Sequence, residues 1–99
     1  MAVWCVVLEC PQCGKQRPYP VPKRVRSVED LEKSPILRLR LATGFGEHYV
    51  YCGGGAPPDE VVEEVIRRAK LMQVPEHVVA EVERRDKKAK WDHYGLCAC

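Results

Sequence analysis

The sequence contains no asparagine, three glutamines and a single phenylalanine among its 99 residues. It has no apolar run approaching the ~20 residues that a membrane-spanning helix needs. The N-terminus lacks the basic residues of a secretory leader, and its apolar stretch is broken at Glu9. These absences predict a cytoplasmic protein without a membrane partner. The scarcity of side-chain amides, beside abundant Val, Arg, Glu and Pro, is a weak sign of a thermophile.

The net charge of +2 is too small to indicate nucleic-acid binding by itself. Its distribution is uneven, because residues 1–56 carry eight Lys or Arg against five Asp or Glu, whereas residues 57–99 carry eight against nine. The bases of the first part predict a face that could follow a phosphate backbone, although a solvated surface is the commoner meaning of such clusters. The predicted nucleic-acid-binding residues are Lys15, Arg17, Lys23, Arg24, Arg26, Arg38 and Arg40.

Six cysteines are many for a chain of this length, and two of them form a Cys-x-x-Cys motif. Cys10-Pro11-Gln12-Cys13-Gly14 follows a strand-like run from Ala2 to Leu8. Two thiolates at this spacing can bind one tetrahedral metal ion, and Gly14 suits the tight turn between them. A thioredoxin-like redox pair is disfavoured, because Gly14 and Pro18 exclude a long helix after Cys13.

A second half-match stands at Tyr49-Val50-Tyr51-Cys52-Gly53, where a strand-like run again ends in a cysteine and glycines. Together the two segments resemble a zinc ribbon, which implies a Zn²⁺ ion held between two β-hairpins. The second Cys-x-x-Cys usual in that family is missing, so a fourth ligand must come from elsewhere.

Two sources of that fourth ligand can be compared. His48 would lie on the same strand as Cys52 but about 13 Å away, so one ion could not take both. We therefore expect the fourth ligand from a C-terminal tail that returns to the ribbon. Cys5 is expected to be a buried small side chain or the disulfide partner of a leftover tail cysteine. The predicted metal ligands are Cys10, Cys13, Cys52, and Cys97 or Cys99.

The pattern predicts strands in the first part of the chain and helices in the second. Ile36 to Thr43 alternates leucine with arginine, and with residues 47–52 it predicts a β-hairpin that turns at Gly44-Phe45-Gly46. Residues 27–33 predict a short helix, and the Gly- and Pro-rich residues 53–58 predict a boundary. The fold class expected is α+β: a zinc-ribbon-like β part over residues 1–56, then a helical hairpin over residues 57–99, packed as one compact unit.

The segment from Ile66 to Val82 is similar to a helix-turn-helix. Small Ala69 falls where two helices would touch, and Pro75 would open the second helix. Gln73 departs from the glycine usual at the turn, and the would-be recognition helix carries Glu76 and Glu81. An ordinary helical hairpin that covers the sheet is the alternative.

These observations predict a zinc-stabilised protein that binds DNA or RNA and acts as a small transcription regulator. The alternative is a zinc-stabilised protein-interaction adaptor that binds no nucleic acid and has a protein partner or forms a homodimer. We expect no enzymatic activity, because the sequence offers no catalytic constellation and a closed four-ligand zinc site is structural.

Overall fold

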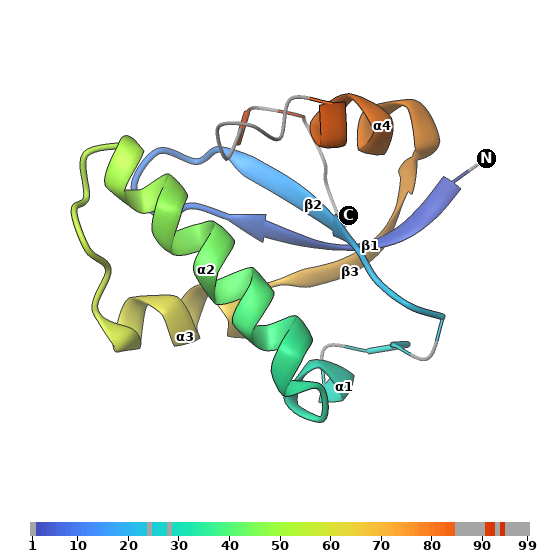
Figure 1. Ribbon diagram of the computed structural model, residues 1–99, viewed down its shortest axis with the longest axis horizontal. Helices are drawn as coiled ribbons and strands as arrows, with labels where there is room; N and C mark the ends of the chain where they lie inside the picture. The colour runs from blue at the N-terminus through green and yellow to red at the C-terminus, as the bar shows by residue number, and fades with distance from the viewer. Residues whose placement is uncertain (1, 24, 28, 85–90, 93, 95–99) are drawn as a thin grey trace.

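The computed structural model describes residues 2–23, 25–27, 29–84, 91, 92 and 94. Three strands and four helices follow one another in the described chain (Figure 1). In order they are β1 (Ala2–Glu9), β2 (Gln16–Pro20), α1 (Glu29–Glu32), α2 (Pro35–Tyr51), α3 (Asp59–Arg67), β3 (Lys70–Pro75) and α4 (Glu76–Arg84).

The strands form one antiparallel sheet in the order β2-β1-β3. The strand predicted from Ala2 to Leu8 is confirmed as β1, and its central place explains why both of its faces are apolar. Cys5 pairs with Pro20 on one side and with Met72 on the other. The proline-rich segment after Arg17, expected to be a free connection, instead forms the edge strand β2, where prolines are tolerated because one side needs no ladder hydrogen bonds.

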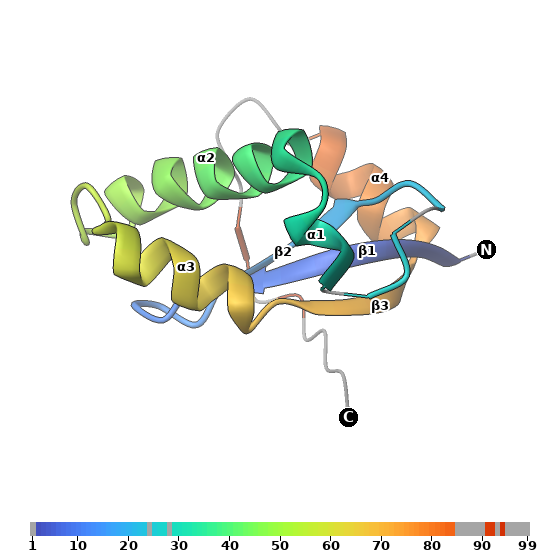
Figure 2. The same ribbon diagram turned by 90° about the horizontal axis from the view of Figure 1, so that it is seen from below.

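Alternate side chains of β1 pack into two separate apolar clusters. Val6 and Leu8 belong to the larger cluster, which includes Leu41 and Phe45 of α2. Cys5 and Val7 belong to a smaller cluster with Val74 of β3 and Val79 of α4. Because successive strand residues point to opposite faces, α2 and α4 are packed against different faces of β1. Figure 1 shows α2 lying across the front of the sheet, and Figure 2 shows it alongside α3.

The predicted β-hairpin over residues 36–52 is wrong, because this segment is the 17-residue helix α2. The leucine–arginine alternation is short, and the buried positions Leu37, Leu41, Phe45 and His48 recur every three or four residues, as on a helix. Gly44, expected in a turn, lies within the helix against the buried ring of Tyr19, where a Cβ atom would clash with that ring.

The predicted helix-turn-helix is also wrong. The helix expected from Asp59 is confirmed as α3, but it ends at Arg67 and the chain then forms β3. The second helix, expected from Pro75, is confirmed as α4. A strand paired with β1 therefore separates the two helices, which cannot meet as a DNA-reading pair.

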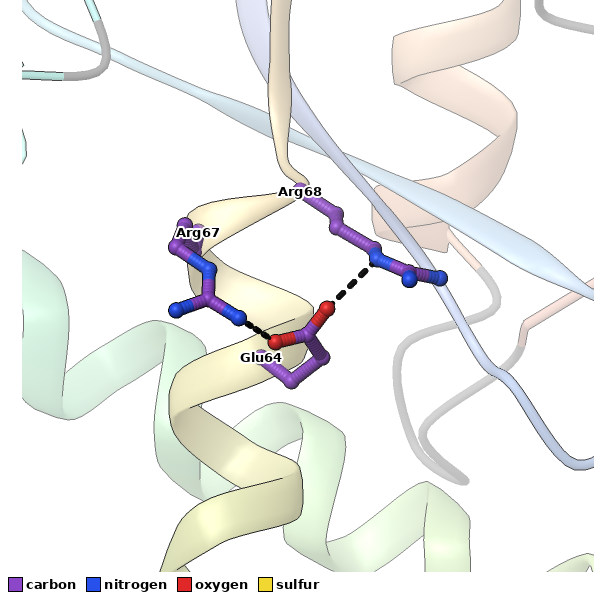
Figure 3. A network of polar contacts seen from close by, with 3 residues as sticks. All are labelled: Glu64, Arg67 and Arg68. Atoms are coloured by element: carbon purple, nitrogen blue, oxygen red, sulfur yellow. Dashed lines mark ion pairs between the residues drawn. The ribbon is translucent and has the colours of Figure 1, made fainter.

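Figure 3 shows the C-terminal end of α3, where Glu64 makes ion pairs with both Arg67 and Arg68. The Arg68 Nε atom lies 2.7 Å from the Glu64 carboxylate. Both arginine side chains are largely exposed, so these pairs contribute little to stability. They do neutralise part of the charge at this end of the helix.

Candidate metal centre

The Cys-x-x-Cys motif forms the turn between β1 and β2. The Gly14 N–H donates to the Cys10 carbonyl at 2.8 Å, and the Cys10 N–H donates to the Lys15 carbonyl at 2.9 Å. Gly14 has a φ of 75°, in the left-handed region that favours glycine, as the sequence predicted. These bonds fix the turn that carries both thiols.

The other half of the site comes from the C-terminal end of α2. His48 lies in the last turn of the helix and Cys52 is its C-cap, with the Cys52 N–H donating to the His48 carbonyl at 2.9 Å. Residues four apart on a helix share one face and are separated by about 6 Å along the axis. The chain then leaves the helix through Gly53, whose φ is 96°.

The two halves meet in one cluster. The ligand atoms of Cys10, Cys13, His48 and Cys52 all lie within 4.8 Å of one another. The Cys10 and Cys52 sulfurs are 3.8 Å apart, and the Cys13 sulfur is 3.2 Å from the His48 Nε2 atom. Figure 1 shows the β1–β2 connection at the same end of the molecule as the C-terminal end of α2. This three-cysteine, one-histidine group could hold a metal ion.

The exclusion of His48 as a ligand fails with the hairpin that it assumed. On a strand, residues 48 and 52 would be about 13 Å apart, whereas on a helix they are neighbours. The helical spacing of Phe45, His48 and Cys52 was the signal in the sequence that could have identified this ligand. The tail residues proposed in its place, Cys97 and Cys99, lie outside the described residues.

The surroundings of His48 favour the neutral, metal-binding form of its imidazole. The ring is buried and stacks on Trp91, with centroids 4.5 Å apart and an angle of 16° between the planes. Burial, and secondarily the charge of Lys15, lowers the pKa of His48. Trp91 is itself buried against Phe45, which confirms it as a core anchor for the C-terminal segment.

The Cys10 thiol is fully buried, and its burial raises its pKa to about 11. Backbone hydrogen bonds from Cys13 and Gln12 act in the opposite direction, because N–H donors favour the thiolate. A bound cation would reverse the effect of burial, since a coordinating thiol is deprotonated outright. The turn therefore supplies the donors that a metal thiolate needs.

Cys5 stands apart from this cluster. It is fully buried on the opposite face of β1, among Val7, Val74 and Val79, and its thiol is free. Burial, and then the charge of Glu83, raises the pKa of Cys5 to about 11. The expectation of a buried small side chain is confirmed.

The predicted basic face does not form as expected. Arg38 and Arg40 were to lie on one side of a strand, but on a helix they project about 200° apart. Arg38 is half-buried and pairs with Glu63 of α3 at 3.6 Å. Arg17 is buried with its guanidinium 4.7 Å from the centre of the Tyr19 ring.

The remaining predicted bases are distributed along the chain. Lys15 is half-buried beside the metal cluster, Lys23, Arg26 and Arg40 are exposed, and Arg24 lies outside the described residues. Only Lys23 and Arg26 share a loop among these exposed described bases. The exposed Trp4 lies beside that loop, and Trp4, Lys23 and Arg26 line one cavity.

Within the described residues, no helix has both the length and the apolar character needed to cross a membrane. Comparison of the chain with protein-family models, with curated proteins and with solved structures finds no match. The geometry of the site therefore carries the functional argument.

Proposed function

We propose that the protein is a non-enzymatic zinc protein in which the ion fastens helix α2 to the β1–β2 turn. The observation that carries this proposal is the convergence of three sulfurs and one imidazole nitrogen on one point. Zn²⁺ takes four such ligands, and its closed four-ligand sites are structural because catalysis needs an open position. The imidazole of His48 completes the set without any residue of the tail.

The spacing of the donor atoms supports zinc. Tetrahedral bonds of about 2.3 Å to sulfur and about 2.0 Å to nitrogen place two sulfurs about 3.8 Å apart, and a sulfur and a nitrogen about 3.5 Å apart. The corresponding distances are 3.8 Å between Cys10 and Cys52 and 3.2 Å between Cys13 and His48. An ion therefore fits the cluster with adjustments of a few tenths of an ångström.

Elemental analysis of the purified chain, together with thiol titration in denaturant, tests the zinc site. We expect one zinc per chain, which a chelator removes with loss of α2. A protein that carries no metal and has Cys10 and Cys13 oxidised would contradict the proposal.

For this zinc-stabilised protein we propose binding of single-stranded nucleic acid at Trp4. The Trp4 side chain is 50% exposed at the N-terminal end of β1. The cavity beside it, of about 660 Å³, is otherwise mostly apolar and includes Lys23 and Arg26. A base can stack on an exposed aromatic ring while neighbouring cations contact the phosphates. This location replaces the arginine face expected from the sequence.

Fluorescence anisotropy with a labelled oligothymidine tests this second step. Trp4→Ala should weaken binding about tenfold, because base–aromatic stacking contributes about 1–3 kcal/mol. Lys23→Ala with Arg26→Ala should reduce the dependence of binding on salt by about 0.7 in log–log slope per lost phosphate contact. Lys70→Ala, an exposed lysine on β3, is the control. Equal affinity of wild type and Trp4→Ala would refute the location.

A protein-interaction adaptor is the second candidate, and one observation favours it. The outer side of α2 is apolar and is not covered by another described element. If no oligonucleotide binds while the zinc site is intact, the adaptor becomes the better proposal.

A further inference from the structure

Four of the five large hydrophobic side chains that are exposed in the described chain lie on α2. Ile36 is 84% exposed, Leu39 67%, Val50 56% and Tyr51 77%. The opposite side of the same helix supplies Leu37, Leu41, Phe45 and His48 to the interior. Scattered exposed hydrophobics are normal on a monomer, but a concentration on one side of one helix marks an interaction surface.

The outer side of α2 also carries charges arranged symmetrically. At 100° per residue, Ile36, Leu39, Arg40, Glu47, Val50 and Tyr51 project within about a third of the helix circumference. Arg40 and Glu47 lie equally far from the point between Thr43 and Gly44, and so do Ile36 and Tyr51. Arg40 and Glu47 form no ion pair within the described part of the chain.

We propose that this face is the interface of a homodimer in which two copies of α2 pack antiparallel about Thr43. A two-fold axis there would place Arg40 opposite Glu47 of the partner subunit, and the same ion pair would form twice. Ile36 would meet Tyr51 of the partner subunit, again twice. A two-fold interface requires one patch to be complementary to itself, and this arrangement satisfies that requirement in both charge and apolar contact.

The small Thr43 side chain at the centre of the face allows the two helices to approach closely. A 17-residue helix is about 25 Å long, so a contact made by α2 alone is at the small end of specific interfaces. The dimer should therefore be weak, with a dissociation constant on the order of micromolar. This inference does not depend on nucleic-acid binding, and the test needs no ligand.

Sedimentation equilibrium of the zinc-loaded full chain, from micromolar to millimolar concentration, measures the dissociation constant. Arg40→Glu alone, or Glu47→Arg alone, would place like charges opposite each other twice and should weaken the dimer at least about tenfold. The double variant Arg40→Glu/Glu47→Arg restores opposite charges and should return the constant to near the wild-type value. Lys70→Glu, a charge reversal on β3, should have no effect.

Zinc content and circular dichroism confirm that each variant is folded, which is expected because all three charged positions are exposed. A wild-type chain that stays monomeric to millimolar concentration would overturn the proposal. So would a double variant that dimerises no better than the single variants.

Discussion

Replacing His48 by alanine should remove one of four metal ligands and with it much of the stability of the protein. Structural zinc sites contribute about 10–16 kcal/mol of apparent binding free energy, so an equal share for each of four ligands is about 2.5–4 kcal/mol. Zinc affinity should therefore fall about a hundred- to a thousandfold. For comparison, the whole free energy of unfolding of a domain is about 5–15 kcal/mol.

The thermal consequence follows from the size of the chain. With an unfolding entropy of about 2.1 cal/mol/K per residue, 99 residues give about 0.2 kcal/mol/K. A loss of 2.5–4 kcal/mol then lowers the melting temperature by about 12–20 °C when zinc is in excess. Competition with a chromophoric chelator measures the affinity, and calorimetry measures the melting temperature.

Two variants separate ligation from packing. His48→Phe keeps an aromatic ring that can stack on Trp91 but cannot bind the ion, so its zinc affinity should fall as far as that of His48→Ala. His77→Ala changes an exposed histidine on α4 and should alter neither quantity. If both His48 variants bind zinc within a few fold of wild type, while Cys97→Ser or Cys99→Ser abolishes binding, the assignment of His48 as the fourth ligand is refuted.

Gly44→Ala should destabilise the protein by about 1 kcal/mol or more, because the new methyl group meets the buried Tyr19 ring and overpacking outweighs the gain in helix propensity. Gly46→Ala, whose new Cβ would have its nearest neighbour 3.9 Å away on Pro57, should stabilise it by up to about 1 kcal/mol, so chemical denaturation should show opposite signs. The Cys5 thiol has a pKa of 9.0 when unfolded and about 11 when folded, so the unfolded chain releases its proton first and stability should fall as pH rises from 9 to 11. That part of the alkaline loss should be absent in Cys5→Ala, and an unchanged slope would contradict it. Chelation of zinc should raise amide exchange in α2 before it does so in α4, as hydrogen–deuterium exchange would measure.

The parts of the fold that could be predicted from the sequence are those encoded by local pattern. The β1 strand and the turn that carries Cys10 and Cys13 depend on a continuous apolar run and one glycine. Strand β3 depends on pairing with β1, about 70 residues away, and only Val74 in it is fully buried. A half-buried edge strand between two helices has no strong local period, so the segment was assigned to helices.

Helix α2 was missed because two glycines and a short alternation resembled a hairpin. Over residues 37–41 the leucines fit a strand and a helix equally well, and only Phe45, His48 and Cys52 decide in favour of the helix. This single error removed His48 from the candidate ligands, because the period of the backbone sets which residues can reach one ion. A wrong secondary structure therefore produced a wrong chemical conclusion from the right residues.

The same features explain why α2 would need a metal ion. Two internal glycines lower its intrinsic stability, and Ser34 at its N-terminus makes no side-chain capping hydrogen bond. Its helical state must therefore come from tertiary contacts: Leu41 and Phe45 in the core near its middle, and His48 and Cys52 at its C-terminal end. The glycine at position 44 that weakens the helix also lets it approach Tyr19, so the close packing of α2 against the hairpin is gained at the expense of local helix propensity. An ion that ties the C-terminal end of α2 to the β1–β2 turn offsets that cost at the end of the helix farthest from Pro35.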